Sequence, residues 1–170
     1  AINMADGVDG LAGSLTLVAC GWYVLLAWLS GAVTIQLMGL LLIGAIAGFL
    51  LLNLRTPWRS RASVFMGDAG SMSLGLLLTW FAVELTGYKS SQIPPIIAVW
   101  VLALPLIDMA CLMVRRIRRG VSPFLADREH LHHVLLLAGY SGEQTVATKA
   151  DISLGWSAAR GAIRWHKSYR

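Results

Sequence analysis

The stretch from Gly10 to Leu54 contains no charged side chain, and this feature most limits how the 170-residue chain can fold. A helix needs about 20 apolar residues to cross the hydrocarbon of a bilayer once, so the stretch is long enough for two crossings. We place them near 15–30 and 32–54, joined by a short turn at Ser30-Gly31. In lipid a helix satisfies its own backbone groups, and its apolar side chains need no protein cover. The sequence therefore predicts a membrane protein.

Two further stretches complete the predicted membrane region, one at 71–85 and one from about Pro95 to Val114. The expected fold is an all-α, polytopic integral membrane protein with about four transmembrane helices and with its chemistry on loops at one face. The chain then divides into a polar motif at 1–14, a four-span membrane domain at 15–114 that includes a Gly-Asp loop at 55–71, an Arg/His loop at 115–140, and a polar basic tail at 141–170.

The positions of the cations predict the orientation, because loops rich in Lys and Arg stay in the cytoplasm. Arginines follow the second and fourth predicted spans, whereas Lys89 is the one cation between spans three and four. The amino end, the 55–71 loop and everything from Arg115 onward are therefore expected at the cytoplasmic face. The net charge of +5 comes from these loops and the tail, so it indicates topology and anionic lipid headgroups. No basic patch interleaved with aromatic residues indicates nucleic-acid binding.

The first group of candidate functional residues is the string Asn3-Met4-Ala5-Asp6-Gly7-Val8-Asp9-Gly10-Leu11-Ala12. If this string is helical, Asp6 and Asp9 project from one face, because residues three apart are neighbours on a helix. The glycines keep that surface open for a ligand. Two acids at a membrane surface indicate cation or phosphate chemistry. The alternative is a capping and turn cluster before the first span, for which Asp and Gly are ordinary choices.

The second group places Asp68 between Gly67 and Gly70 where the third predicted span begins. The carboxylate of Asp68 could ligate Mg²⁺, and backbone N–H groups near Gly70 and Ser71 could face a phosphate at a helix start. The alternative is that Asp68 or Ser71 simply caps the helix.

The third group is the segment from Ser122 to His133, which contains Arg128, His130, His132 and His133. His130 and His133 are one helical step apart and could act together on a ligand. Zinc is a competing interpretation, but no Cys lies nearby. A solvated basic loop that only sets topology is another. Imidazoles beside several arginines fit an anionic, phosphate-rich ligand better than a metal.

Together the three strings resemble the polyprenyl-phosphate N-acetylhexosamine-1-phosphate transferase family, over roughly residues 1–140. The His-Leu-His-His form after Ser122-Pro123-Phe124 is most similar to the bacterial UDP-GlcNAc:undecaprenyl-phosphate members. The resemblance implies transfer of GlcNAc-1-phosphate from a UDP-sugar to undecaprenyl phosphate. UMP would be released, and the reaction would initiate lipid-linked glycan synthesis. It also implies a bacterial inner membrane, a cytoplasmic cleft and Mg²⁺ or Mn²⁺.

By the same resemblance, Asp68 holds the metal, and Asp6 and Asp9 position the metal or the nucleotide sugar. Asn3 is expected to hydrogen-bond the sugar nucleotide. The substrate's phosphates or sugar are expected to be gripped by four side chains, Arg128, His130, His132 and His133. The implied partners are the UDP-sugar, the polyprenyl phosphate and membrane lipids. Apolar stripes on the spans could also serve a second copy of the chain in a homodimer.

The chain departs from the family's pattern in two ways. The family carries a paired-aspartate string on an earlier cytoplasmic loop, and nothing before Asn3 supplies it, so a catalytically incomplete fragment is one alternative. The family also continues with membrane helix after the histidines, whereas 142–170 is polar. There an apolar stripe that includes Ile152 and Trp156 predicts either a helix lying on the inner leaflet or an unrelated terminus.

Asp108 is the one acid well inside a predicted span. A carboxylate there is costly and often functional. We expect it to face the bundle interior and bond to a neighbouring helix, or to lean toward the cytoplasmic arginines. A transporter remains the alternative from another class; it predicts ionisable groups through the bilayer midplane and broken helices.

Overall fold

Residues 1–5, 8–55, 62–87, 93–120, 122, 135 and 139–165 are the part of the chain described by the structure, a computed structural model. Every regular element in these ranges is a helix, which confirms the predicted all-α fold. The helices are α1 (Ile2–Ala5), α2 (Leu11–Ser30), α3 (Val33–Asn53), α4 (Gly67–Gly87), α5 (Pro95–Val101), α6 (Ala103–Arg118) and α8 (Gly142–Trp165).

Three of these helices, α2, α3 and α4, are long and apolar enough to cross a membrane. The first two form the predicted hairpin. Its turn is at Gly31, whose φ of 71° is a left-handed conformation that glycine adopts without strain. α2 begins earlier than predicted, and α4 is longer at both ends. The chain is a multi-pass membrane protein, as its sequence predicts.

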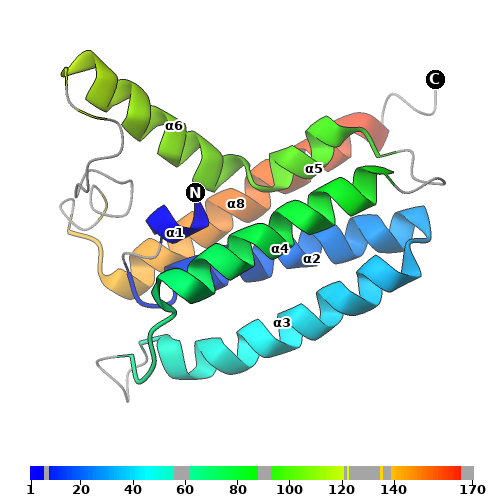
Figure 1. The fold of residues 1–170 in the computed structure, drawn as a ribbon, viewed down its shortest axis with the longest axis horizontal. Coiled ribbons are helices and arrows are strands. Elements are labelled where there is room, and N and C mark those ends of the chain that lie inside the picture. Colours follow the sequence, from blue (N-terminus) through cyan, green and yellow to red (C-terminus); the bar gives the residue numbers. More distant parts are fainter. Residues whose placement is uncertain are drawn as a thin grey trace.

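The bundle is built around α2, which packs against α3, α4, α5 and α8 (Figure 1). Tyr23 of α2 is buried, and its ring centroid lies 6.3 Å from that of Phe81 of α4. Much of α3 faces outward, with Leu41 and Leu51 about three-quarters exposed at 76% and 75%. Such side chains need lipid around them, so this face of α3 is the expected lipid-facing surface.

The fourth predicted span, 95–114, is bent in the structure. α5 and α6 meet at Leu102 at an angle of 77°, so together they form either a broken span or a re-entrant segment. Pro105 provides the physical reason, because it has no N–H to offer the carbonyl of Val101 one turn earlier. The C-terminal part of α6 then extends away from the other helices (Figure 1).

The break in this span frees a carbonyl that α2 then satisfies. The N–H of Leu102 turns to the carbonyl of Val99 at 3.0 Å instead of continuing the helical pattern to Ala98. The hydroxyl of Tyr23 donates to the carbonyl of Ala98 at 2.9 Å. An unpaired backbone group is expensive where water is absent, so this bond stabilises the bend.

The predicted tail contains a helix, α8, that packs against α2, α5 and α6, where the sequence predicted a helix lying on the inner leaflet. Its buried residues include the apolar Val146 and three polar residues that repeat every four positions, Thr145, Lys149 and Ser153. The Nζ atom of Lys149 lies 3.0 Å from Oδ2 of Asp108 on α6. This ion pair confirms the expectation that Asp108 faces the interior and bonds to a neighbouring helix.

Candidate active site

The polar motifs from distant parts of the sequence meet at one end of the bundle, where α2 and α4 begin and α3 ends (Figure 1). Among the predicted site residues, the structure describes Asn3, Asp9 and Asp68. The other predicted site residues lie outside the described part of the chain; they are Asp6, Arg128, His130, His132 and His133.

A hydrogen bond joins the first motif to the second. The buried hydroxyl of Ser71 donates to Oδ1 of Asn3 at 2.9 Å. The carbonyls of Gly67 and Asp68 are alternative acceptors for this hydroxyl, at 3.0 and 3.2 Å. The short helix α1 packs against α4 and holds Asn3 in this position. Asn3 and the first turn of α4 therefore form one local site.

Asp68 lies in the first turn of α4 with its side chain exposed. The turn begins at Gly67, where φ is 65°, a value that disfavours any residue with a Cβ. A carboxylate in the first turn is favoured by the helix dipole, whose positive end lies there. The backbone therefore presents Asp68 to solvent within one helical turn of Ser71, the residue that bonds to Asn3.

Asn53, the last residue of α3, connects the loops that carry both motifs. Its Oδ1 accepts the N–H of Gly10 at 2.7 Å, and its Nδ2 donates to the carbonyl of Val64 at 2.7 Å. The side chain is only 5% exposed, so these bonds replace lost hydration. Asn53 is not among the site residues predicted from the sequence. Its signal in the sequence is an amide that ends a run without polar side chains at 37–52.

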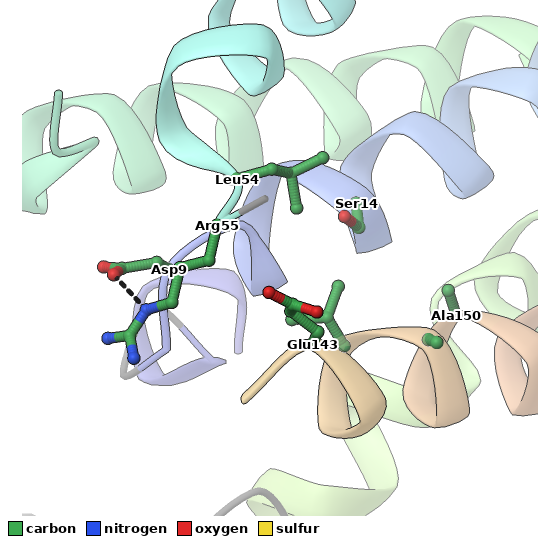
Figure 2. Close-up of a pocket in the computed structure, with 8 residues that line it drawn as sticks. Asp9, Ser14, Leu54, Arg55, Glu143 and Ala150 are labelled. Carbon is green, nitrogen blue, oxygen red and sulfur yellow. Dashed lines mark hydrogen bonds and ion pairs between the residues drawn. The ribbon is translucent and has the colours of Figure 1, made fainter. Parts of the chain in front are cut away.

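Asp9 forms an ion pair with Arg55, which follows α3. The Nε of Arg55 donates to Oδ2 of Asp9 at 2.8 Å (Figure 2). The Asp9 side chain is 15% exposed and that of Arg55 46%. From the sequence, Arg55 had been interpreted only as a topology signal. The structure makes it part of the site, because one oxygen of a predicted site carboxylate is bonded to it.

A cavity of about 340 Å³ lies beside this ion pair, between the beginnings of α2 and α8 and the end of α3. Figure 2 shows Asp9 and Arg55 at its rim, with Glu143 of α8 across from them. The remaining lining residues are Ser14, Leu54, Val146, Ala147 and Ala150. The cavity therefore combines mostly apolar walls with a charged rim.

Gly10 is required for the close approach of the first motif to α3. Its φ of 82° is left-handed, and a Cβ at this position would overlap the side chain of Leu54. The Gly10 conformation also directs its N–H toward Asn53. The glycine thus has a backbone reason to follow Asp9, independent of any ligand.

The described donors fit a divalent cation that is bound together with a substrate. Within the described ranges, no group of three or more His, Cys, Asp and Glu side chains is placed to hold a metal ion. The described side-chain donors beside α4, Asp68 and Asn3, are oxygen ligands. Mg²⁺ prefers oxygen, keeps several waters and is commonly held by one or two carboxylates plus substrate phosphates. Asp68 with Asn3 nearby satisfies that requirement.

The fold and site define a class: a multi-pass helical membrane protein with acidic, amide and cationic groups gathered at one end of its bundle. The chain belongs to glycosyl transferase family 4, whose family model matches residues 1–86.

Named relatives are similar over most of the chain. An undecaprenyl-phosphate alpha-N-acetylglucosaminyl 1-phosphate transferase of Escherichia coli (strain K12) is 41% identical over 144 residues, which is 85% of this chain and 39% of the relative. The protein of the same name from Yersinia pestis is 42% identical over 144 residues, again 85% of this chain and 39% of the relative. The one from Haemophilus influenzae is 40% identical over 132 residues, 78% of this chain and 37% of the relative. The chain thus spans about two-fifths of the length of these relatives.

Proposed function

We propose that this protein transfers N-acetylglucosamine-1-phosphate from a UDP-sugar to undecaprenyl phosphate and releases UMP. The observation that carries the proposal is the meeting of Asn3, Asp68 and Ser71 at one end of a membrane bundle whose relatives are named for this transfer. The product would be the first lipid-linked intermediate of a glycan. Both substrates bring phosphate to a membrane surface, where these polar groups are expected.

The main physical demand of this reaction is charge. A pyrophosphate and a lipid phosphate repel each other, so a site that brings them into line must supply compensating positive charge and fixed dipoles. Asp68 would hold Mg²⁺ or Mn²⁺, with Asp6 and Asp9 positioning the metal or the nucleotide sugar. When bound, the metal neutralises charge that develops between the phosphates.

The remaining predicted residues bind and orient the substrates in this proposal. Asn3 is held by Ser71 and would present its amide N–H group to the sugar nucleotide. Arg128, His130, His132 and His133 would grip phosphate or sugar from the segment that precedes α8. Arginine suits this role because its planar fork of donors matches phosphate oxygens.

The proposed location is the inner membrane of a bacterium, with the site facing the cytoplasm. Two groups of arginines support this orientation: Arg55 after α3 and the basic last turn of α6. The positive-inside rule expects such cations on the cytoplasmic side of the membrane.

The transporter alternative has some support in the broken α5–α6 segment and the buried pair of Asp108 and Lys149. We prefer the transferase, because the relatives carry that name and the three described predicted site residues lie at one end of the bundle.

The test is a transfer assay with the full chain in membranes, using labelled UDP-GlcNAc and undecaprenyl phosphate with Mg²⁺ or with EDTA. We expect product only with metal. Asp68→Asn should lower the rate by about 100-fold or more, as loss of a charge-stabilising group typically does. Glu84→Gln is the matched control, because Glu84 is an exposed acid at the other end of the same helix.

Two results would count against the proposal. One is no product from a folded, inserted protein, either alone or extended to the length of its relatives. The other is an Asp68→Asn variant as active as Glu84→Gln.

A further inference from the structure

Arg55 is placed to bind a ligand as well as to pair with Asp9. The bond to Asp9 uses its Nε, so it leaves both terminal nitrogens of the guanidinium for other acceptors. Almost half of the side chain, 46%, is exposed, and Nη1 lies beside Gly142 at the start of α8. Asp9 is much less exposed, and its carboxylate holds the Nε side of the guanidinium.

Apart from Ser14, the walls of the cavity beyond its charged rim are apolar. Leu54, Val146, Ala147 and Ala150 line a cavity of about 340 Å³, within the range of about 300 to 1,000 Å³ common for small-molecule sites. A cation at the rim of an apolar cavity complements a molecule with a phosphate at one end and a hydrocarbon chain at the other. A nucleoside diphosphate has no such chain to place against these walls.

We propose that Arg55 binds the phosphate of the polyprenyl phosphate acceptor while the first carbons of its chain occupy the cavity between α2, α3 and α8. This inference rests on the proposed function for the identity of the ligand. Asp9 acts here as a positioning residue, because it fixes the Nε side of the guanidinium and leaves the fork of terminal nitrogens for phosphate oxygens. Glu143, across the rim, opposes an anionic headgroup and limits the affinity.

The experiment is calorimetric binding to the full chain in nanodiscs, with three probes: farnesyl phosphate, farnesol and UDP-GlcNAc. Arg55→Gln should weaken the binding of farnesyl phosphate about 10- to 100-fold, as loss of a charge-assisted bidentate contact typically does. It should leave the affinities for farnesol and UDP-GlcNAc unchanged. Arg55→Lys should bind farnesyl phosphate with an affinity between those of the native protein and Arg55→Gln, because lysine keeps the charge and loses the planar fork of donors. Lys89→Gln removes the same charge at a sequence position between α4 and α5, and it should change the binding of none of the three probes.

Two further variants test the cavity and the opposing charge. Ala147→Phe fills the cavity from an exposed position on α8 and should weaken farnesyl phosphate and farnesol alike. Glu143→Gln removes the opposing carboxylate and should tighten the binding of farnesyl phosphate by a few-fold, with no effect on the binding of farnesol.

Several results would overturn the inference. Farnesyl phosphate binding unchanged by Arg55→Gln would do so, and so would a loss of UDP-GlcNAc alone, which would assign Arg55 to the nucleotide. Equal losses of affinity for farnesyl phosphate and farnesol in Arg55→Gln would show a packing defect. Unchanged binding of both probes in Ala147→Phe would place the polyprenyl chain outside this cavity. The binding experiment needs no turnover, so it can be separated from the transfer assay. Arg55-dependent binding of farnesyl phosphate without any transfer activity would contradict only the proposed function. Transfer activity without Arg55-dependent binding would contradict only this inference.

Discussion

Asn53 shows how a single amide can organise a membrane protein's polar end. It lies where α3 leaves the apolar region, and it bonds to one backbone group from each of two loops, at Gly10 and Val64. An amide can do this because it offers both a donor and an acceptor. A hydrophobic residue there would leave both backbone groups without a partner.

Asn53→Ala is expected to reduce the free energy of unfolding by about 2 to 6 kcal/mol, because it abandons two backbone polar groups and each costs about 1 to 3 kcal/mol. The measurement is an SDS titration of the protein in mixed micelles. Thr34→Ala, an exposed polar position on the same helix, is the control and should change little. Equal stability of the two variants would show that the Asn53 bonds are not needed.

Gly10→Ala should cost at least about 1 to 2 kcal/mol of the same unfolding free energy, the penalty of a left-handed conformation for a residue with a Cβ. The overlap with Leu54 adds to this cost. Combining it with Leu54→Ala removes the overlap and isolates the backbone part. Gly21→Ala is the control, since nothing lies within 4 Å of a Cβ there. A Gly10→Ala variant as stable as Gly21→Ala would contradict the required left-handed turn.

At the scale of helices, the buried pair of Asp108 and Lys149 joins α6 to α8. Lys149 is 1% exposed, and its four-carbon stem lies in the polar face that also contains Thr145 and Ser153. A charge that deep must be paired, because desolvation of a lone ammonium group costs several kcal/mol. The pair therefore holds α8 against the bundle only while both partners are present.

Asp108→Asn is expected to destabilise the protein by about 3 to 5 kcal/mol, because it leaves the Lys149 ammonium buried without its counter-ion. The double variant Asp108→Asn with Lys149→Met removes both charges and should recover most of that loss. The check is a double-mutant cycle on unfolding free energy in micelles. Additive effects of the two changes would show that the two side chains do not interact.

At the scale of the whole molecule, the described predicted site residues lie where α2 and α4 begin, whereas Glu84 lies at the other end of α4. The loop before α4 and the last turn of α4 lie at opposite ends of that helix. The positive-inside rule assigns the first to the cytoplasm and the second to the outside. The orientation of the entire protein can therefore be tested with one residue at each end.

In a Cys111→Ser background, which removes the exposed native thiol, Gly87→Cys should react with an impermeant maleimide added outside spheroplasts. Ser63→Cys should react only after permeabilisation. Cys20 is buried and stays as a silent internal reference. The opposite pattern would invert the topology and place the site outside the cell, where no UDP-sugar is expected.

Much of this architecture was predictable because it depends on local composition. The charge-free stretch predicts the α2–α3 hairpin, and Ser30-Gly31 predicts its turn, since hydropathy and glycine conformation act over neighbouring residues. The bend at Leu102 was missed because the apolar run continues through Pro105, and a proline early in a helix is compatible with both a straight and a broken span. The structure of the predicted Arg/His segment at 123–134 lies outside the described residues.

A helical membrane protein with three polar strings in a set order could be predicted from the sequence, because hydropathy and motifs are properties of the linear chain. Which of these groups meet depends on the packing of the helices. Asp9 and Arg55 are 46 positions apart, and Lys149 and Asp108 are 41 apart. These contacts depend on how each helix is rotated and where it ends relative to its neighbours, and no local pattern carries that information.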